Sequence, residues 1–140
     1  MRIIQFTVPC KPLSINHIYG QARTGRKYMK EEGKGLMALV SLMAKQAMRA
    51  DGHKLIETPF SMTVVYYMLP KNEMDVTNCE KALIDAMQSI VFKNDKQLGK
   101  NGDPYWSKQG IYFGATFRKF VGVCEPHIDV TITYHERERK

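Results

Sequence analysis

Residues 60–69 form the segment that most constrains the fold of this chain, because both alternating faces of the segment are apolar. The run from Phe60 to Leu69 ends at Pro70, which lacks the N–H that a paired strand needs. A strand that is apolar on both faces belongs in the interior of a sheet, with helices packed on one side. The sequence therefore predicts a central strand at 60–69 and a layered fold around it.

Three further strands are expected to pair with it. Residues 2–8 are rich in β-branched and aromatic side chains and are followed by Pro9 and Pro12. Another strand is expected at about 111–119. The last, at about 127–134, alternates between apolar and polar residues, which predicts one buried face and one outward face. The expected inward residues are Ile128, Val130, Ile132 and Tyr134, and the outward ones are Asp129, Thr131 and Thr133.

Two helices are predicted from the spacing of apolar residues. The first begins at Leu36 and ends near Asp51, where Gly52 can adopt the left-handed cap. The second is expected to begin at about Asn78, with Thr77 and Glu80 forming a capping box. Residues 13–35 contain several glycines and show no sustained period, so we expect a long functional loop there. The buried stripe of the second helix is predicted to be Ala82, Leu83, Ala86 and Ile90.

The predicted order is β-loop-α-β-α-β-β, an α/β (α+β) fold with a mixed sheet of about four strands and two helices packed on it. The 140 residues, of which 44% are hydrophobic, suffice for one core, so we expect a single domain over 1–140. No apolar run is long enough for a membrane span, and no charged-then-apolar leader opens the chain. The three cysteines are widely separated and do not form a disulfide framework. We therefore expect a soluble, cytoplasmic protein with reduced thiols.

Charge is concentrated in the first part of the chain. Residues 1–50 carry nine Lys and Arg against two Glu, and this balance accounts for the whole net charge of +7. Such a distribution favours a polyanionic partner. Within it, residues 16–30 interleave cations, aromatics and amides, as DNA phosphate contacts and base stacking require, although a charged run can also be a plain solvated face. The candidate DNA-binding residues are Asn16, Tyr19, Arg23, Arg26, Lys27, Tyr28 and Lys30.

Two aspartates, Asp75 and Asp95, flank the second predicted helix at its two ends. If the chain bends back after the helix, their carboxylates can act together as ligands for a hard cation such as Mg²⁺. On the helix, Lys81 and Asp85 lie one turn apart, and with Asn78 they are expected on one face. Simpler interpretations exist: Asp75 as a helix-end charge, Asp95 as a turn residue, and Lys81 with Asp85 as a surface salt bridge.

The spacing of these polar residues resembles that of the RusA-type Holliday junction resolvases. The likeness rests on Asp75-x-x-Asn78-x-x-Lys81-x-x-x-Asp85, followed by Phe92-x-Asn94-Asp95-x-Gln97. Earlier in the chain, Pro9, Pro12, Ser14, Asn16 and Tyr19, then Gly25-Arg26-Lys27-Tyr28, are similar to the opening motifs of that family. The resemblance covers nearly the whole chain. It implies a small, homodimeric, Mg²⁺-dependent endonuclease, encoded by a bacterium or its phage, that acts on branched DNA.

The resemblance also implies residue roles. Asp75 and Asp95 would bind Mg²⁺, or Mn²⁺ in its place, Asp85 would add a ligand or hold Lys81, and Lys81 would stabilise the transition state. Thr77, Asn78 and Asn94 would support the site. The family usually has an aspartate where this chain has Thr77, and paired aspartates where it has Asn94-Asp95. A hydroxyl is a weaker ligand than a carboxylate, and Glu73 is near enough in sequence to compensate.

The sequence thus predicts a Mg²⁺-dependent crossover junction endodeoxyribonuclease that resolves four-way DNA by paired, symmetric nicks in recombination and repair. Two alternatives remain. In the first, the replacement at Thr77 leaves a junction-binding protein with weakened catalysis. In the second, the chain is a small basic adaptor for nucleic acid or protein, with its aspartates merely solvated.

Overall fold

The computed structural model describes residues 2–94, 97, 105–107, 110–112 and 114–134. Its main sheet is mixed, with the strand order β1-β8-β4-β7. Strand β8 runs antiparallel to β1 and β4, and β7 runs parallel to β4. The predicted fold class and the central position of the 60–69 strand are confirmed. The strands are β1 (Arg2–Val8), β4 (Phe60–Met68), β7 (Ala115–Val121) and β8 (His127–Tyr134).

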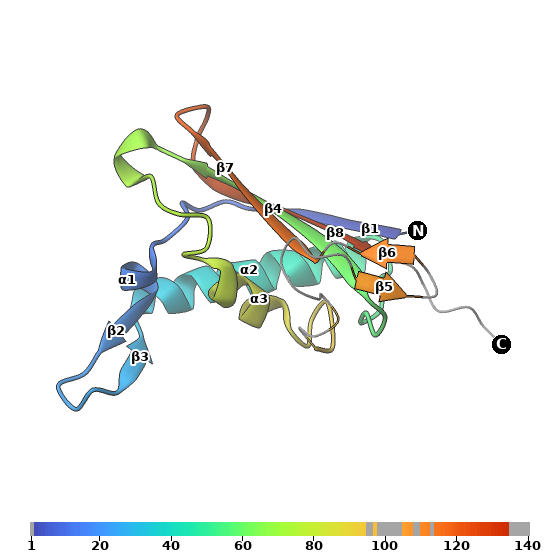
Figure 1. The fold of residues 1–140 in the computed structure, drawn as a ribbon, viewed down its shortest axis with the longest axis horizontal. Coiled ribbons are helices and arrows are strands. Elements are labelled where there is room, and N and C mark those ends of the chain that lie inside the picture. The colour runs from blue at the N-terminus through green and yellow to red at the C-terminus, as the bar shows by residue number, and fades with distance from the viewer. Residues whose placement is uncertain (1, 95–96, 98–104, 108–109, 113, 135–140) are drawn as a thin grey trace.

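Two longer helices, α2 (Glu31–Ala50) and α3 (Glu80–Met87), lie together on one face of this sheet (Figure 1). Two short helical segments are α1 (Ile15–Ile18) and the 3-10 turn η1 (Pro70–Asn72). A small hairpin of β2 (Tyr19–Gln21) and β3 (Lys27–Met29) projects from the end of the molecule where α2 begins (Figure 1). Strands β5 (Tyr105–Ser107) and β6 (Gly110–Tyr112) form a separate antiparallel pair.

The core lies between the sheet and the two helices. Strand β8 buries every second residue, as its alternation predicts, and the expected inward residues are all buried. Helix α2 contributes a stripe at helical spacing that packs on the sheet. The buried hydrophobic residues of β4 and α2 are Phe60, Met62, Val64, Tyr66, Met68, Leu36, Val40, Ala44 and Met48. No helix within the described residues is long and apolar enough to cross a membrane.

The prediction of a long loop at 13–35 is wrong, because this segment contains α1, the β2–β3 hairpin and the first turn of α2. The hairpin closes through a turn in which Gly25 has φ 85°. Helix α2 begins at Glu31 rather than Leu36, although Gly33 lies in its first turn. A Cβ at Gly33 would come within 2.7 Å of the Ile18 carbonyl oxygen, so glycine is what lets α1 pack against α2.

The predicted capping box is also wrong, because α3 begins at Glu80 with Cys79 as its N-cap and no side-chain cap. Residues 75–79 instead form a turn, in which the Asn78 N–H donates to the Asp75 carbonyl at 3.1 Å. The Asn78 side chain accepts the N–H of Ile15 and donates to the carbonyl of Asp75. These two bonds hold the turn outside the helix. As a result Asn78 does not share a helix face with Lys81 and Asp85, and Thr77 is an exposed turn residue.

Two other boundaries differ from the prediction. Helix α3 ends at Met87, so Ile90 lies beyond it and is half-buried rather than part of the helical stripe. The strand expected at about 111–119 is divided at Gly114, which has φ 68°. A positive φ is readily adopted only by glycine and breaks the regular extended backbone. The part of the segment that joins the main sheet is therefore β7, from Ala115 onwards.

Candidate active site

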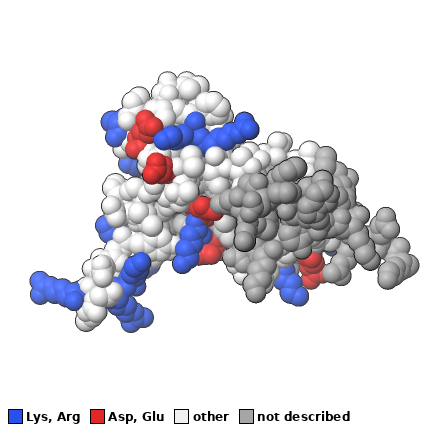
Figure 2. All heavy atoms as spheres, viewed as in Figure 1, with Lys and Arg blue, Asp and Glu red and all other residues white. Residues whose placement is uncertain are grey.

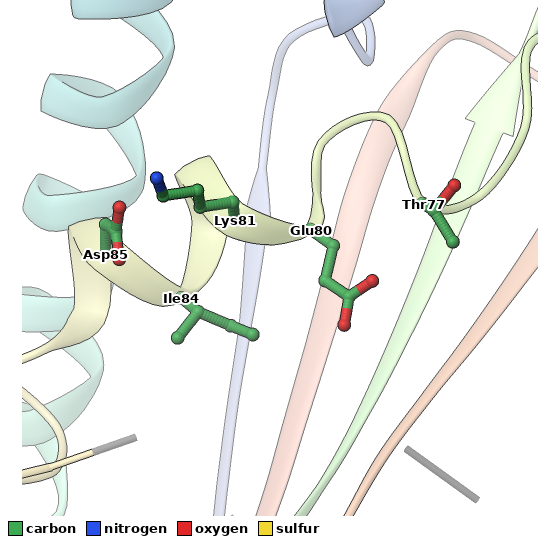
Figure 3. Close-up of a pocket in the computed structure, with 5 residues that line it drawn as sticks. All are labelled: Thr77, Glu80, Lys81, Ile84 and Asp85. Carbon is green, nitrogen blue, oxygen red and sulfur yellow. The ribbon is translucent and has the colours of Figure 1, made fainter. Parts of the chain in front are cut away.

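The exposed face of α3 carries Lys81 and Asp85, one helical turn apart. Because the opposite face of the helix is buried in the core, both side chains point away from the sheet. Figure 3 shows that they extend to the same side of α3. Within the described residues no ion pair joins them, so the simple surface salt bridge is not formed. They line a cavity of about 390 Å³ together with Thr77, Glu80 and Ile84 (Figure 3).

Lys81 also lines a second cavity, of about 370 Å³, between α3 and the β2–β3 hairpin. This cavity is walled on its other side by α1 and the hairpin. Three predicted DNA-binding residues therefore meet the predicted catalytic lysine around one hollow: Asn16, Tyr19 and Lys27. Since Lys81 lines both cavities, the residue lies between the basic hairpin and the Thr77–Asp85 side of the helix.

The other predicted DNA-binding residues lie outside this second cavity but on the same projecting segment. Arg23 and Arg26 are exposed in the turn of the hairpin. The ring of Tyr28 lies against Gly20, where a Cβ would come within 2.6 Å of it. Lys30 is exposed at the N-cap of α2. Figure 2 shows basic side chains, and no acidic ones, at the hairpin end of the molecule. The structure therefore gathers these residues into one basic projection.

Asp75 lies in the turn before α3, and hydrogen bonds fix its backbone while its side chain stays exposed. The Asp75 carbonyl accepts bonds from the Asn78 N–H and from Asn78 Nδ2, each at 3.1 Å. Asn78 Oδ1 in turn accepts the Ile15 N–H at 3.0 Å. Asn78 therefore joins the turn that carries Asp75 to the beginning of α1.

Cys79 makes a second link between the same two segments. Its Sγ donates to the Leu13 carbonyl at 2.7 Å, and the residue is fully buried. Burial raises the pKa of the Cys79 thiol to about 12, so the group stays protonated and can donate at neutral pH. The thiol and the Asn78 amide together hold α1 and its Asn16 beside α3.

Lys119, on β7, is a residue of this region that sequence reasoning missed. Its Nζ donates to Glu73 Oε2 at 2.9 Å and to the Met74 carbonyl at 3.2 Å. The pair holds the backbone directly before Asp75 and engages Glu73, which was the candidate to compensate for Thr77. The signal was present in the alternation of β7, because Lys119 occupies the same face as the buried Ala115, where a lysine needs a partner.

The segment after α3 is held by Phe92 and Gln97. Phe92 is fully buried and stacks on Phe60, with ring centroids 4.8 Å apart. Gln97 Nε2 donates to the Ile56 and Thr58 carbonyls, at 2.9 Å each, and Gln97 Oε1 accepts the Asn94 N–H at 2.7 Å. Asp95, the predicted second metal ligand, lies outside the described residues, so its distance from Asp75 stays a prediction.

Comparison with known families identifies the chain. A family model described as endodeoxyribonuclease RusA matches residues 9–133. The chain belongs to the RusA endodeoxyribonuclease family. Its members are Holliday junction resolving endonucleases, hydrolases that act on DNA and bind branched junctions. A search of curated proteins gave no match.

The oxygen-rich donors of this RusA-family site fit a hard cation. Thr77 and Asp85 face one cavity, and the Asp75 carboxylate is exposed in the adjoining turn. Carboxylate and hydroxyl oxygens suit Mg²⁺, whereas thiolate or imidazole would favour softer metals. Among the described residues, no three acidic, histidine or cysteine side chains come together. Asp95, the other acidic ligand predicted from the sequence, lies outside the described residues.

The hydrogen bonds of Gln97 lead to a prediction for the RusA motif Asn94-Asp95-x-Gln97. A Gln97→Met variant keeps the length of the side chain but removes three hydrogen bonds, those to the Ile56 and Thr58 carbonyls and to the Asn94 N–H, at about 0.5–1.5 kcal/mol for each bond. We expect a lower melting temperature and slower cleavage of DNA, since the turn beside Asn94 loses its anchor. Thermal unfolding and single-turnover kinetics measure both effects. Gln46→Met, at an exposed position of α2, is the control and should change neither.

Proposed function

We propose that this RusA-family chain is a divalent-cation-dependent, homodimeric resolvase that cuts one phosphodiester in each of two opposed strands of a four-way junction. The observation that carries the proposal is the position of Lys81, which lines both the cavity of the basic hairpin and the cavity that contains Thr77 and Asp85. DNA held by the hairpin would thereby present a phosphate to the acidic side of α3.

Each residue then has a definite task. Asp75 and Asp95 hold the cation, and Asp85 supplies a further oxygen or orients Lys81. The cation that these residues would hold would supply positive charge beside the scissile phosphate and would favour ionisation of the attacking water. Lys81 meets the charge that develops on the departing 3′-oxygen, where a preorganised cation acts more strongly than in water. Asn94 supports the site from the turn that Gln97 anchors.

Residues 16–30 bind the DNA. Asn16, Tyr19 and Lys27 contact the backbone next to Lys81, and Arg23, Arg26, Tyr28 and Lys30 extend this contact along the hairpin and the start of α2. A homodimer follows from the substrate, because a two-fold symmetric junction needs two related active sites. The setting is recombination and repair in the bacterial cytoplasm, with the chain encoded by the host or a phage.

The test is incubation of an end-labelled four-way junction with the protein, with and without Mg²⁺ or Mn²⁺. We expect paired nicks at symmetric positions in the presence of the cation, bound but uncut junction in its absence, and no cutting of linear duplex. Cleavage that continues in a chelator would refute the dependence on a cation. Equal affinity for duplex and junction, together with no cleavage, would refute the resolvase and favour the adaptor.

A second candidate, a junction-binding protein of weak activity, is favoured by Thr77 alone. This hydroxyl lines the cavity next to Asp85 in place of the aspartate that is usual in the family. Such a protein would bind four-way DNA tightly but leave it uncut at millimolar Mg²⁺ or Mn²⁺. A Thr77→Asp variant would then gain cleavage, because the added carboxylate restores a charged ligand.

A further inference from the structure

A third, smaller cavity adjoins the candidate active site on a different side of α1. Its volume is about 180 Å³. The short helix divides its side chains between the two hollows: Asn16 lines the cavity that contains Lys81, whereas His17 lines this one. The opposite wall is the stretch 72–74, which begins at the last residue of η1 and leads into Asp75. The cavity therefore lies beside the turn that carries a predicted metal ligand.

The polar groups of this cavity suit an anion. Lys11 is exposed on its wall, and no carboxylate among the described residues forms an ion pair with it. The acidic residue of the wall, Glu73, is neutralised by Lys119 at 2.9 Å. Ser14 and Asn72 add donors, and the Ser14 hydroxyl makes no capping bond to α1. His17, also on the wall, has its Nδ1 3.5 Å from Glu32 Oε2. Lys11 is therefore the charged residue of the wall that has no ion-pair partner among the described residues, and neutral donors lie around it.

The walls are also held in place. Lys119 binds the Met74 carbonyl on one side, and Asn78 and Cys79 attach α1 and Leu13 on the other. A cavity whose two walls are fixed to the same turn keeps its polar groups at a constant distance from Asp75. Groups positioned in this way can fix a ligand relative to the reacting bond.

We propose that this cavity is a second phosphate subsite, in which Lys11, Ser14 and Asn72 hold a DNA backbone phosphate beyond the one that is cleaved. The proposal rests on the proposed function, since it needs DNA to lie across Asp75. The strand is then held on both sides of the scissile bond, by the hairpin and Lys81 on one side and by this cavity on the other. Because only backbone is contacted, the subsite adds affinity and register but no sequence preference.

The test measures the affinity for a four-way junction over a series of salt concentrations, with wild type, Lys11→Met, Asn72→Ala and Lys54→Met. Log K falls as log salt rises, and the loss of one phosphate contact in Lys11→Met should make this fall shallower, by about 0.9 in slope. Asn72→Ala should bind more weakly with the slope unchanged, because it removes a donor without a charge. Lys54→Met is the control, because Lys54 is an exposed lysine three residues after Asp51, whose carbonyl accepts a bond from Arg2 at the beginning of β1. This variant should keep the affinity and the slope of wild type.

The outcomes separate this proposal from the proposed function. If wild type binds and cuts the junction, and Lys11→Met and Lys54→Met both keep the wild-type slope, the subsite is refuted while the proposed resolvase function stands. Wild type that neither binds nor cuts overturns both. All the substituted residues are exposed, so thermal melting curves that match wild type exclude loss of the fold as the cause.

Discussion

Replacing Asp75 by asparagine should reduce cleavage of four-way junctions by about 10³-fold or more while junction binding in a chelator stays close to wild type. The carbonyl of residue 75 holds the turn through Asn78, and asparagine keeps that backbone intact. Only the charge of an exposed side chain changes. A ligand of a hard cation loses most of its affinity when its carboxylate becomes an amide, so the effect falls on catalysis rather than on DNA binding.

The measurement is single-turnover cleavage at saturating enzyme, beside a gel-shift titration without divalent ions. Asp95→Asn should behave in the same way, because the two carboxylates are proposed to hold one cation. Asp51→Asn is the matched control, since Asp51 is an exposed aspartate at the end of α2 that lies near the N-terminal strand. Cleavage retained by Asp75→Asn would remove that residue from the mechanism.

The elements that could be predicted from the sequence are those whose signal is local. The strand at 127–134 has the predicted bounds because its alternation has a period of two and its buried face is apolar throughout. The position of Lys81 and Asp85 on one helix face follows from their spacing of four residues. Neither depends on a distant part of the chain.

The features that could not be predicted depend on tertiary contacts. The first turn of α2 was hidden because Gly33 is typical of a loop, and its purpose is visible only where Ile18 approaches it. The capping box at Thr77 failed because the partner of Asn78 is the N–H of Ile15, 63 residues earlier. No local pattern contains such a contact. The same holds for the candidate site, where the meeting of the hairpin with Lys81 required the fold.

A Lys81→Met variant should cut four-way junctions about 10²–10³-fold more slowly at saturating DNA, with little loss of affinity. Methionine has a similar apolar stem, so the packing of α3 is kept and only the ammonium group is removed. Lys81 borders both the hairpin cavity and the Thr77–Asp85 cavity, and the proposed function puts the scissile phosphate beside it. The rate is expected to fall because developing charge on the leaving oxygen is no longer met.

The contrast with Lys27→Met makes the experiment decisive. Lys27 lines the same hairpin cavity but lies on β3, away from the acidic side of α3. Its loss should weaken DNA binding and make the fall of log K with log salt shallower, by about 0.9 in slope. The cleavage rate at saturating DNA should stay unchanged. If Lys81→Met also weakened DNA binding without changing the rate at saturating DNA, Lys81 would only contact the DNA backbone. A fall in rate at full occupancy, absent in Lys27→Met, is the result that a transition-state role requires.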